Sequence, residues 1–138
     1  MKKALLIVTA LALVLGASTL AAANTYWQGK YSSGDQGIWK GTLYDDPTGP
    51  AAPHFEGKWA SMDVAKQGKM YATLKYDGIG KYKIVKGVLF DEKGNVVGYW
   101  DGYFDLTVKP GVAGGSWAWI DGPVNGMWKG QMVLSLDE

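Results

Sequence analysis

Hydrophobic and polar residues alternate along most of the chain. In the stretch from Gly98 to Val108 every second residue is glycine or apolar, and three polar residues fall between them. A period of two residues is typical of a strand with one buried face. The pattern G-x-W-x-G that opens this stretch returns at residues 37–41 and 126–130, so the chain uses the same kind of strand three times.

The alternation predicts about eight strands at hairpin spacing and no amphipathic helix after residue 23. We expect the strands at residues 25–31, 37–44, 55–62, 69–76, 79–90, 98–108, 113–120 and 124–136. Residues 91–95 are the clearest hairpin loop, residues 45–53 the longest irregular loop, and residues 63–68 fit either a helical turn or a hairpin tip. The predicted fold is all-β, an antiparallel up-and-down meander in a closed or partly closed barrel, with a β-sandwich as the alternative.

Glycine and tryptophan share a face in these strands. An indole on a pleated sheet needs space beside it, and glycine supplies that space while the ring covers the bare backbone. Trp39, Trp59, Trp100 and Trp128 alternate in phase with Leu, Phe or Met and not with charged residues, so we expect them in the core. Gly87 is expected to bend or bulge its strand.

Residues 1–23 have a different composition. Lys2 and Lys3 precede an apolar run, and small residues end at Ala23, the pattern of a cleaved secretory signal peptide. An uncleaved anchor is the alternative, but the break at Gly16 and the alanine-rich end favour cleavage. We therefore expect a periplasmic or secreted protein with one domain at residues 24–138. The chain has no cysteine, so no disulfide supports this domain.

Charge and residue types restrict the partners. Removing Lys2 and Lys3 changes the formal charge from +1 to −1, and every basic residue is lysine. Nucleic acid and phosphorylated ligands are therefore not expected. A membrane barrel needs an apolar lipid-facing band, so we expect no membrane span after signal removal. The outward positions instead carry Lys40, Glu56, Lys58, Asp101, Asp105, Lys129 and Gln131.

The sequence contains few residues that could form a catalytic or metal site. His54 is the single histidine and has no cysteine to complete a typical zinc site, and no G-x-S-x-G turn presents a serine. Asp101 and Asp105 would lie about 13 Å apart along one strand face, beyond the working separations of glycosidases. We expect no enzyme, no cofactor and no metal; if activity were found, Asp101 would be the first residue to mutate.

One short motif resembles a known family. Gly57-Lys58-Trp59 is similar to the G-x-W that opens lipocalin-type and avidin-type barrels, whose members bind small ligands inside an eight-stranded meander. The match covers three residues, and the missing arginine departs from the usual lipocalin pattern. We transfer no functional residues from this resemblance.

The preferred hypothesis is an exported, non-enzymatic barrel that binds a small apolar or aromatic ligand in its tryptophan-lined interior. One alternative is carbohydrate or cell-surface binding through exposed tryptophans, with Trp27, Trp117 and Trp119 the first candidates. Another is a structural protein without a small ligand, whose sheet edges pair with a partner chain. The oligomeric state stays open. The expected ligand-binding residues are Trp39, Trp59, Trp100, Trp117, Trp119 and Trp128.

Overall fold

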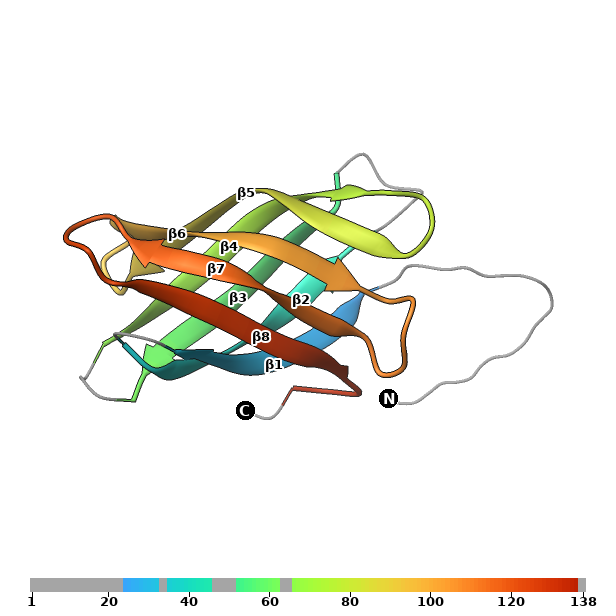
Figure 1. The fold of residues 1–138 in the computed structure, drawn as a ribbon, viewed down its shortest axis with the longest axis horizontal. Coiled ribbons are helices and arrows are strands. Elements are labelled where there is room, and N and C mark those ends of the chain that lie inside the picture. The colour runs from blue at the N-terminus through green and yellow to red at the C-terminus, as the bar shows by residue number, and fades with distance from the viewer. Residues whose placement is uncertain (1–23, 33–34, 46–51, 63–65, 137–138) are drawn as a thin grey trace, which may run out of the picture.

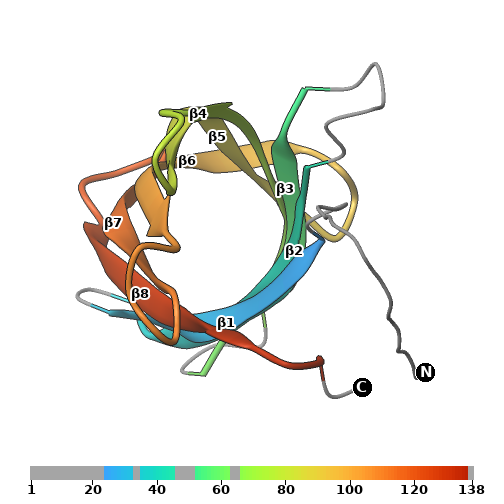
Figure 2. The ribbon, with the colours of Figure 1, turned by 90° about the vertical axis from the view of Figure 1, so that its right-hand side faces the viewer.

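Eight antiparallel strands form a closed barrel (Figures 1 and 2). The computed structural model describes residues 24–32, 35–45, 52–62 and 66–136. Each strand pairs with the next one in the chain, and the last pairs back with the first, which confirms the predicted meander and barrel and excludes the sandwich. The strands are β1 (Thr25–Ser32), β2 (Gly37–Tyr44), β3 (His54–Ser61), β4 (Gln67–Tyr76), β5 (Lys81–Asp91), β6 (Val96–Asp105), β7 (Val112–Trp119) and β8 (Asn125–Val133).

The two ends of the barrel differ in their connections. The β1–β2, β3–β4, β5–β6 and β7–β8 hairpins lie together at the end on the left of Figure 1, which we call the tryptophan end. The other connections, the start of β1 and the end of β8 lie at the opposite, terminal end, which faces the viewer in Figure 2. Within the described ranges, no helix is long and apolar enough to cross a membrane.

Most predicted strand ends are correct to within two residues, but two strands end three residues earlier than predicted. β6 ends at Asp105 and not at Val108, because the Asp105 carboxylate accepts the backbone N–H of Thr107 at 2.8 Å and turns the chain. β8 ends at Val133, which pairs with the second residue of β1, so no strand continues beside it. Leu134, which the predicted strand at 124–136 includes in phase with Trp128, lies beyond β8 and is 98% exposed, so its expected place in the alternation is wrong.

Some sequence predictions fall on parts of the chain that the structure does not describe. The predicted signal peptide at residues 1–23 and most of the loop at 45–53 lie outside the described residues. Residues 63–65 of the segment 63–68 also lie outside them, whereas Gln67 and Gly68 belong to β4.

The predicted irregularity near Gly87 is present in β5. Thr73 pairs with Lys86 and Leu74 pairs with Ile84, so Val85 is an extra residue between two ladder positions. Such a β-bulge increases the local twist of the strand. This extra twist helps a small sheet to curl and close.

The barrel interior is filled with side chains, most of them aromatic. An eight-stranded barrel is just wide enough for its inward side chains to fill it. Trp27, Phe55, Phe104 and Leu43 are the largest side chains that are fully buried. The predicted core residues Trp39, Trp59, Trp100 and Trp128 are all buried.

Trp39 shows how an indole fits into this wall. Gly29 stands directly opposite it on β1, and Gly130 stands opposite Gly29 on β8. The ring therefore crosses two strands of bare backbone, and its N–H donates to the Lys129 carbonyl at 3.3 Å. A Cβ atom on Gly130 would lie 2.4 Å from Trp39 Cζ2 and 2.4 Å from the Gln28 carbonyl oxygen. Only glycine leaves room for this arrangement.

Three other tryptophans repeat the arrangement. Each lies over a glycine of the neighbouring strand, and each indole N–H donates to a backbone carbonyl two strands away. This geometry satisfies a buried donor without a polar side chain. The three sets are Trp59 over Gly68 to the Phe90 carbonyl at 3.0 Å, Trp100 over Gly87 to the Tyr71 carbonyl at 3.1 Å, and Trp128 over Gly115 to the Asp101 carbonyl at 2.8 Å.

Gly130→Ala should therefore destabilise the barrel by about 2–3 kcal/mol, because the added methyl group overpacks the wall against Trp39. Gly114→Ala is the matched control, since that glycine pairs with the exposed Lys129 and its nearest neighbour would be a carbonyl oxygen at 3.3 Å. The control should change stability by less than about 1 kcal/mol. Urea denaturation followed by far-ultraviolet circular dichroism measures both, and equal losses would contradict the packing argument.

Candidate functional site

The interior aromatic residues form two clusters. The central cluster consists of Trp27, Trp39, Phe55, Trp100, Phe104 and Trp128, joined by ring contacts with centroids 5.0–6.2 Å apart. The mouth cluster consists of Tyr31, Trp59, Trp117 and Trp119, at the tryptophan end. Among the described residues no ring contact joins the two clusters, so aromatic packing is interrupted between them.

A small cavity lies where the two clusters meet. Its volume is about 30 Å³, and its lining surface is apolar. A water molecule needs roughly 10–15 Å³ of such space and two to four polar partners, so the cavity has room for a water but holds it poorly. The lining residues are Tyr31, Trp39, Trp59, Met70, Leu89, Trp100, Trp117, Trp119 and Trp128.

Trp117, in the wall of this cavity, carries an unusual polar group. Its indole N–H is buried and has no hydrogen-bond partner among the described residues. Trp39, Trp59, Trp100 and Trp128 all donate to backbone carbonyls. A buried donor without a partner destabilises the fold by about 1–3 kcal/mol. A ligand that places a hydrogen-bond acceptor beside the Trp117 N–H would therefore be stabilised there.

Trp117 lies where the ladder between β1 and β8 ends. Trp117 stands opposite Gly126 on β8, which repeats the first half of the tryptophan-over-glycine arrangement. The next strand around the barrel is β1, and its ladder with β8 ends at the pair Ser32 and Met127. In the four complete sets the acceptor is the carbonyl of the residue that precedes the glycine's own cross-strand partner. The counterpart here is Ser32, the last paired residue of β1, and it accepts no hydrogen bond from Trp117.

Trp119 closes the cavity toward the tryptophan end. It is half-buried, and its ring lies 5.0 Å from that of Trp117 and 5.2 Å from that of Trp59. Val97 and Val124 are also partly buried and pack against the core. Trp119 is thus the most accessible of the cavity tryptophans.

Comparison with protein-family models, with curated proteins and with solved structures finds no match to this chain. The site must therefore be understood from its own geometry.

The structure brings the six tryptophans expected from the sequence to one place, since all of them line this cavity. Trp27 lies in the central cluster, and its N–H donates to Thr25 Oγ1 at 2.8 Å. Trp27 and Trp117 are buried, so they offer no exposed platform for a carbohydrate. Closure of β8 on β1 also leaves no sheet edge among the described strands for pairing with a partner chain.

Sequence reasoning missed three cavity residues, Tyr31, Met70 and Leu89. Each faces inward in its own strand, and the period-two pattern of that strand already marked it as an inward position. The alternation does not give the stagger between neighbouring strands. That stagger decides which inward residues lie at the same height along the barrel axis.

The other candidate chemistry lies on the outer wall. His54 Nε2 is 3.1 Å from the Glu56 carboxylate, and its ring stacks on Tyr44 with centroids 5.0 Å apart. Asp101 is exposed, and its carboxylate accepts the backbone N–H of Gly102 at 2.9 Å. Within the described ranges, no group of three or more His, Cys, Asp or Glu side chains is placed to hold a metal ion.

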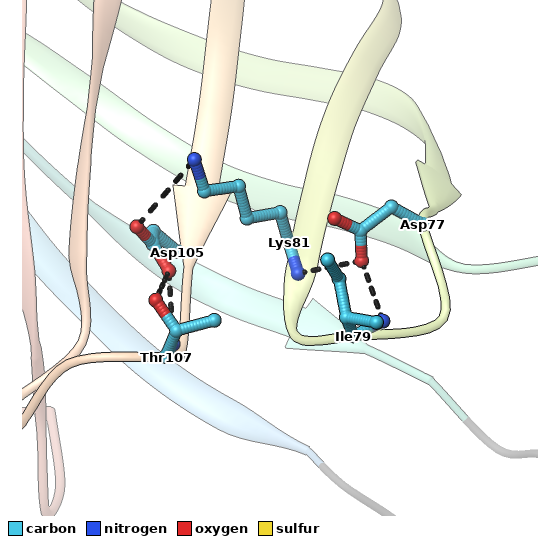
Figure 3. Close-up of polar contacts among 5 residues, drawn as sticks. All are labelled: Asp77, Ile79, Lys81, Asp105 and Thr107. Carbon is cyan, nitrogen blue, oxygen red and sulfur yellow. Dashed lines mark hydrogen bonds and ion pairs between the residues drawn. The ribbon is translucent and has the colours of Figure 1, made fainter.

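Aspartates at the terminal end stabilise its turns (Figure 3). The Asp105 carboxylate accepts the hydroxyl and the backbone N–H of Thr107 and lies 4.0 Å from Lys81 Nζ, and these contacts lower the pKa of Asp105. Asp77 accepts the backbone N–H groups of Ile79 and Lys81, which lower its pKa as well. These carboxylates organise loops and do not face the cavity.

Trp117→Phe and Trp128→Phe form a matched pair, since both side chains are 5% exposed and lose the same atoms. Trp128→Phe removes the hydrogen bond from the indole N–H to the Asp101 carbonyl, whereas Trp117→Phe removes a donor that has no partner. Trp128→Phe should therefore be more destabilising by about 1–2 kcal/mol in urea denaturation. Equal losses would mean that the Trp117 N–H already has a partner, such as an ordered water.

Asp105→Asn should destabilise the protein at neutral pH. A carboxylate with a lowered folded pKa stabilises the fold above its unfolded pKa of about 3.9, and this contribution disappears as the pH falls through the folded pKa. The urea midpoints of wild type and variant should therefore converge as the pH falls through the lowered folded pKa. Asp121→Asn is the control, because Asp121 is exposed; a pH-independent difference at Asp105 would contradict the assignment.

Proposed function

We propose that the protein binds a small, neutral aromatic or apolar molecule carrying one hydrogen-bond acceptor, in the cavity at the tryptophan end. The observation that supports this most directly is the buried, unpartnered N–H of Trp117 in the wall of an apolar cavity. Ligand sites are mostly apolar, with a few polar groups that fix orientation. The signal-like amino-terminal sequence supports export as part of the same proposal.

Entry of such a ligand requires Trp119 to move. The cavity of about 30 Å³ is too small for an aromatic ring. Displacing the Trp119 ring vacates a space that fits another flat ring of similar size. The same movement uncovers Trp117, whose ring Trp119 contacts. Trp119 acts as the gate in this proposal, and Trp117 as the orienting donor.

The chemistry of the wall restricts the ligand class. The lining residues are aromatic apart from Met70 and Leu89, and no lysine or carboxylate is among them. An ionised ligand would lose its hydration there without gaining a counter-charge. Flat aromatic rings instead gain edge-to-face contacts with indoles beyond the area that they bury. The proposed ligand is therefore neutral, flat and weakly polar.

Naphthalene and quinoline test the proposal, because they have the same shape and only quinoline carries a ring-nitrogen acceptor. Both should change the tryptophan emission of wild type and release heat in calorimetric titration. In Trp117→Phe the ratio of quinoline affinity to naphthalene affinity should fall by roughly 2- to 12-fold, which is the net free energy of one hydrogen bond. Trp27→Phe is the control, since Trp27 does not line the cavity.

Trp119→Ala tests the gate separately. Removing the ring opens the mouth, so both compounds should bind more tightly and make emission more sensitive to acrylamide. If neither compound binds wild type or Trp119→Ala, the barrel is a filled structural element and the proposal fails. An affinity ratio that Trp117→Phe leaves unchanged would remove Trp117 from the site.

A further inference from the structure

The outer wall carries lysines in unusual register. Among the cross-strand partners of the described strands, charged residues stand directly opposite each other five times. Four of these five pairs join two lysines, and one joins lysine to aspartate. Like charges directly opposite each other destabilise a sheet, so fold stability does not account for this arrangement.

Three of the four lysine pairs form one continuous band. Lys40, Lys58 and Lys69 stand side by side on β2, β3 and β4. Lys30 and Lys129 stand side by side on β1 and β8, next to this row. Neighbouring strands are about 4.8 Å apart, so the five lysines follow one another around five strands. We call this set the lysine band.

All five lysines of the lysine band line one broad depression, together with residues 90–94 of the β5–β6 hairpin. Lys30, Lys58, Lys69 and Lys129 are exposed, and none forms an ion pair within the described part of the chain. Their charge is available to a partner. Two opposed ammonium groups repel each other, so covering them with a partner is unfavourable by itself. It becomes favourable only when the partner places an anion between them.

Glutamines extend the same row. Gln28 stands directly opposite Lys40 on one side and Gln131 on the other, and both line the depression. An amide both donates and accepts hydrogen bonds, and so suits hydroxyl groups, whereas an ammonium only donates. The row consists of ammonium and amide groups, with no carboxylate and no apolar side chain between them. Such a row matches a polymer that carries anionic and hydroxyl groups.

From this arrangement we infer that the lysine band binds a linear anionic polysaccharide lying across β8, β1, β2, β3 and β4. The band is one or two residues wide, which fits a chain and not a flat surface. No aromatic side chain stands within the row from Gln131 to Lys69, so single-stranded nucleic acid would lack its stacking platform.

Polygalacturonate, a polymer of hydroxylated and carboxylated sugars, is the probe. Wild type should bind it at low salt, should not bind neutral dextran, and should lose affinity steeply between about 50 and 200 mM salt. The triple variant Lys40→Gln, Lys58→Gln, Lys69→Gln should bind at least about tenfold more weakly. Removing opposed like charges should leave its urea midpoint unchanged or raised.

The control is the triple variant Lys75→Gln, Lys83→Gln, Lys86→Gln, which removes the same charge outside the lysine band and includes the fourth lysine pair. It should lose less than about threefold in affinity. The single variant Lys58→Gln gives an intermediate loss and serves if the band triple does not fold, because Lys58 opposes both Lys40 and Lys69.

Several outcomes would overturn the inference. Equal losses in the two triple variants would show that only net charge matters. Tighter binding to oligothymidylate or to phosphatidylglycerol vesicles than to polygalacturonate would assign the band to nucleic acid or to a membrane instead. Quinoline binding in the cavity should be unaffected by the band variants, so this experiment and that of the proposed function can fail independently.

Discussion

A buried indole N–H needs an acceptor, and this requirement shapes the wall of the barrel. For four of the buried indoles the acceptor is a backbone carbonyl two strands away, and a side chain between ring and carbonyl would block access. Trp39 reaches the Lys129 carbonyl only because Gly29 and Gly130 lie beneath its ring. Four of the seven tryptophans in the chain use this same device. In each case one tryptophan ring links three neighbouring strands.

This device also explains why the sheet closes. A tryptophan that spans two neighbouring strands binds them from the inside, and its ring must lie nearly flat against the wall. Trp39 does this across the junction of β8 and β1, the pair that closes the barrel. Bare backbone permits the strong coiling that a small barrel needs. The bulge at Val85 adds twist on the opposite side of the meander.

The candidate site lies at the tryptophan–glycine pair that lacks a carbonyl acceptor. Trp117 has the glycine beside it, but its N–H has no acceptor among the described residues, at the level where the ladder between β1 and β8 ends at Ser32. At the same level the two aromatic clusters separate and leave the small cavity. The outer wall has a second irregularity, the opposed lysines of the lysine band. Both features are locally unfavourable for stability, and both become favourable when a suitable partner is present.

The sequence alone determined the strand positions, the meander and the inward phase of every central tryptophan. Those properties follow from the two-residue period and from turn residues, which act over a few neighbouring positions. It did not determine where β6 and β8 end, since Asp105 turns the chain by a side-chain contact and β8 stops where its neighbours stop. Nor did it show that Trp117 lacks an acceptor or that Lys40, Lys58 and Lys69 stand in line. Those facts depend on the register between strands far apart in the chain. Only the closed barrel decides that register, because each strand's stagger must fit both neighbours at once.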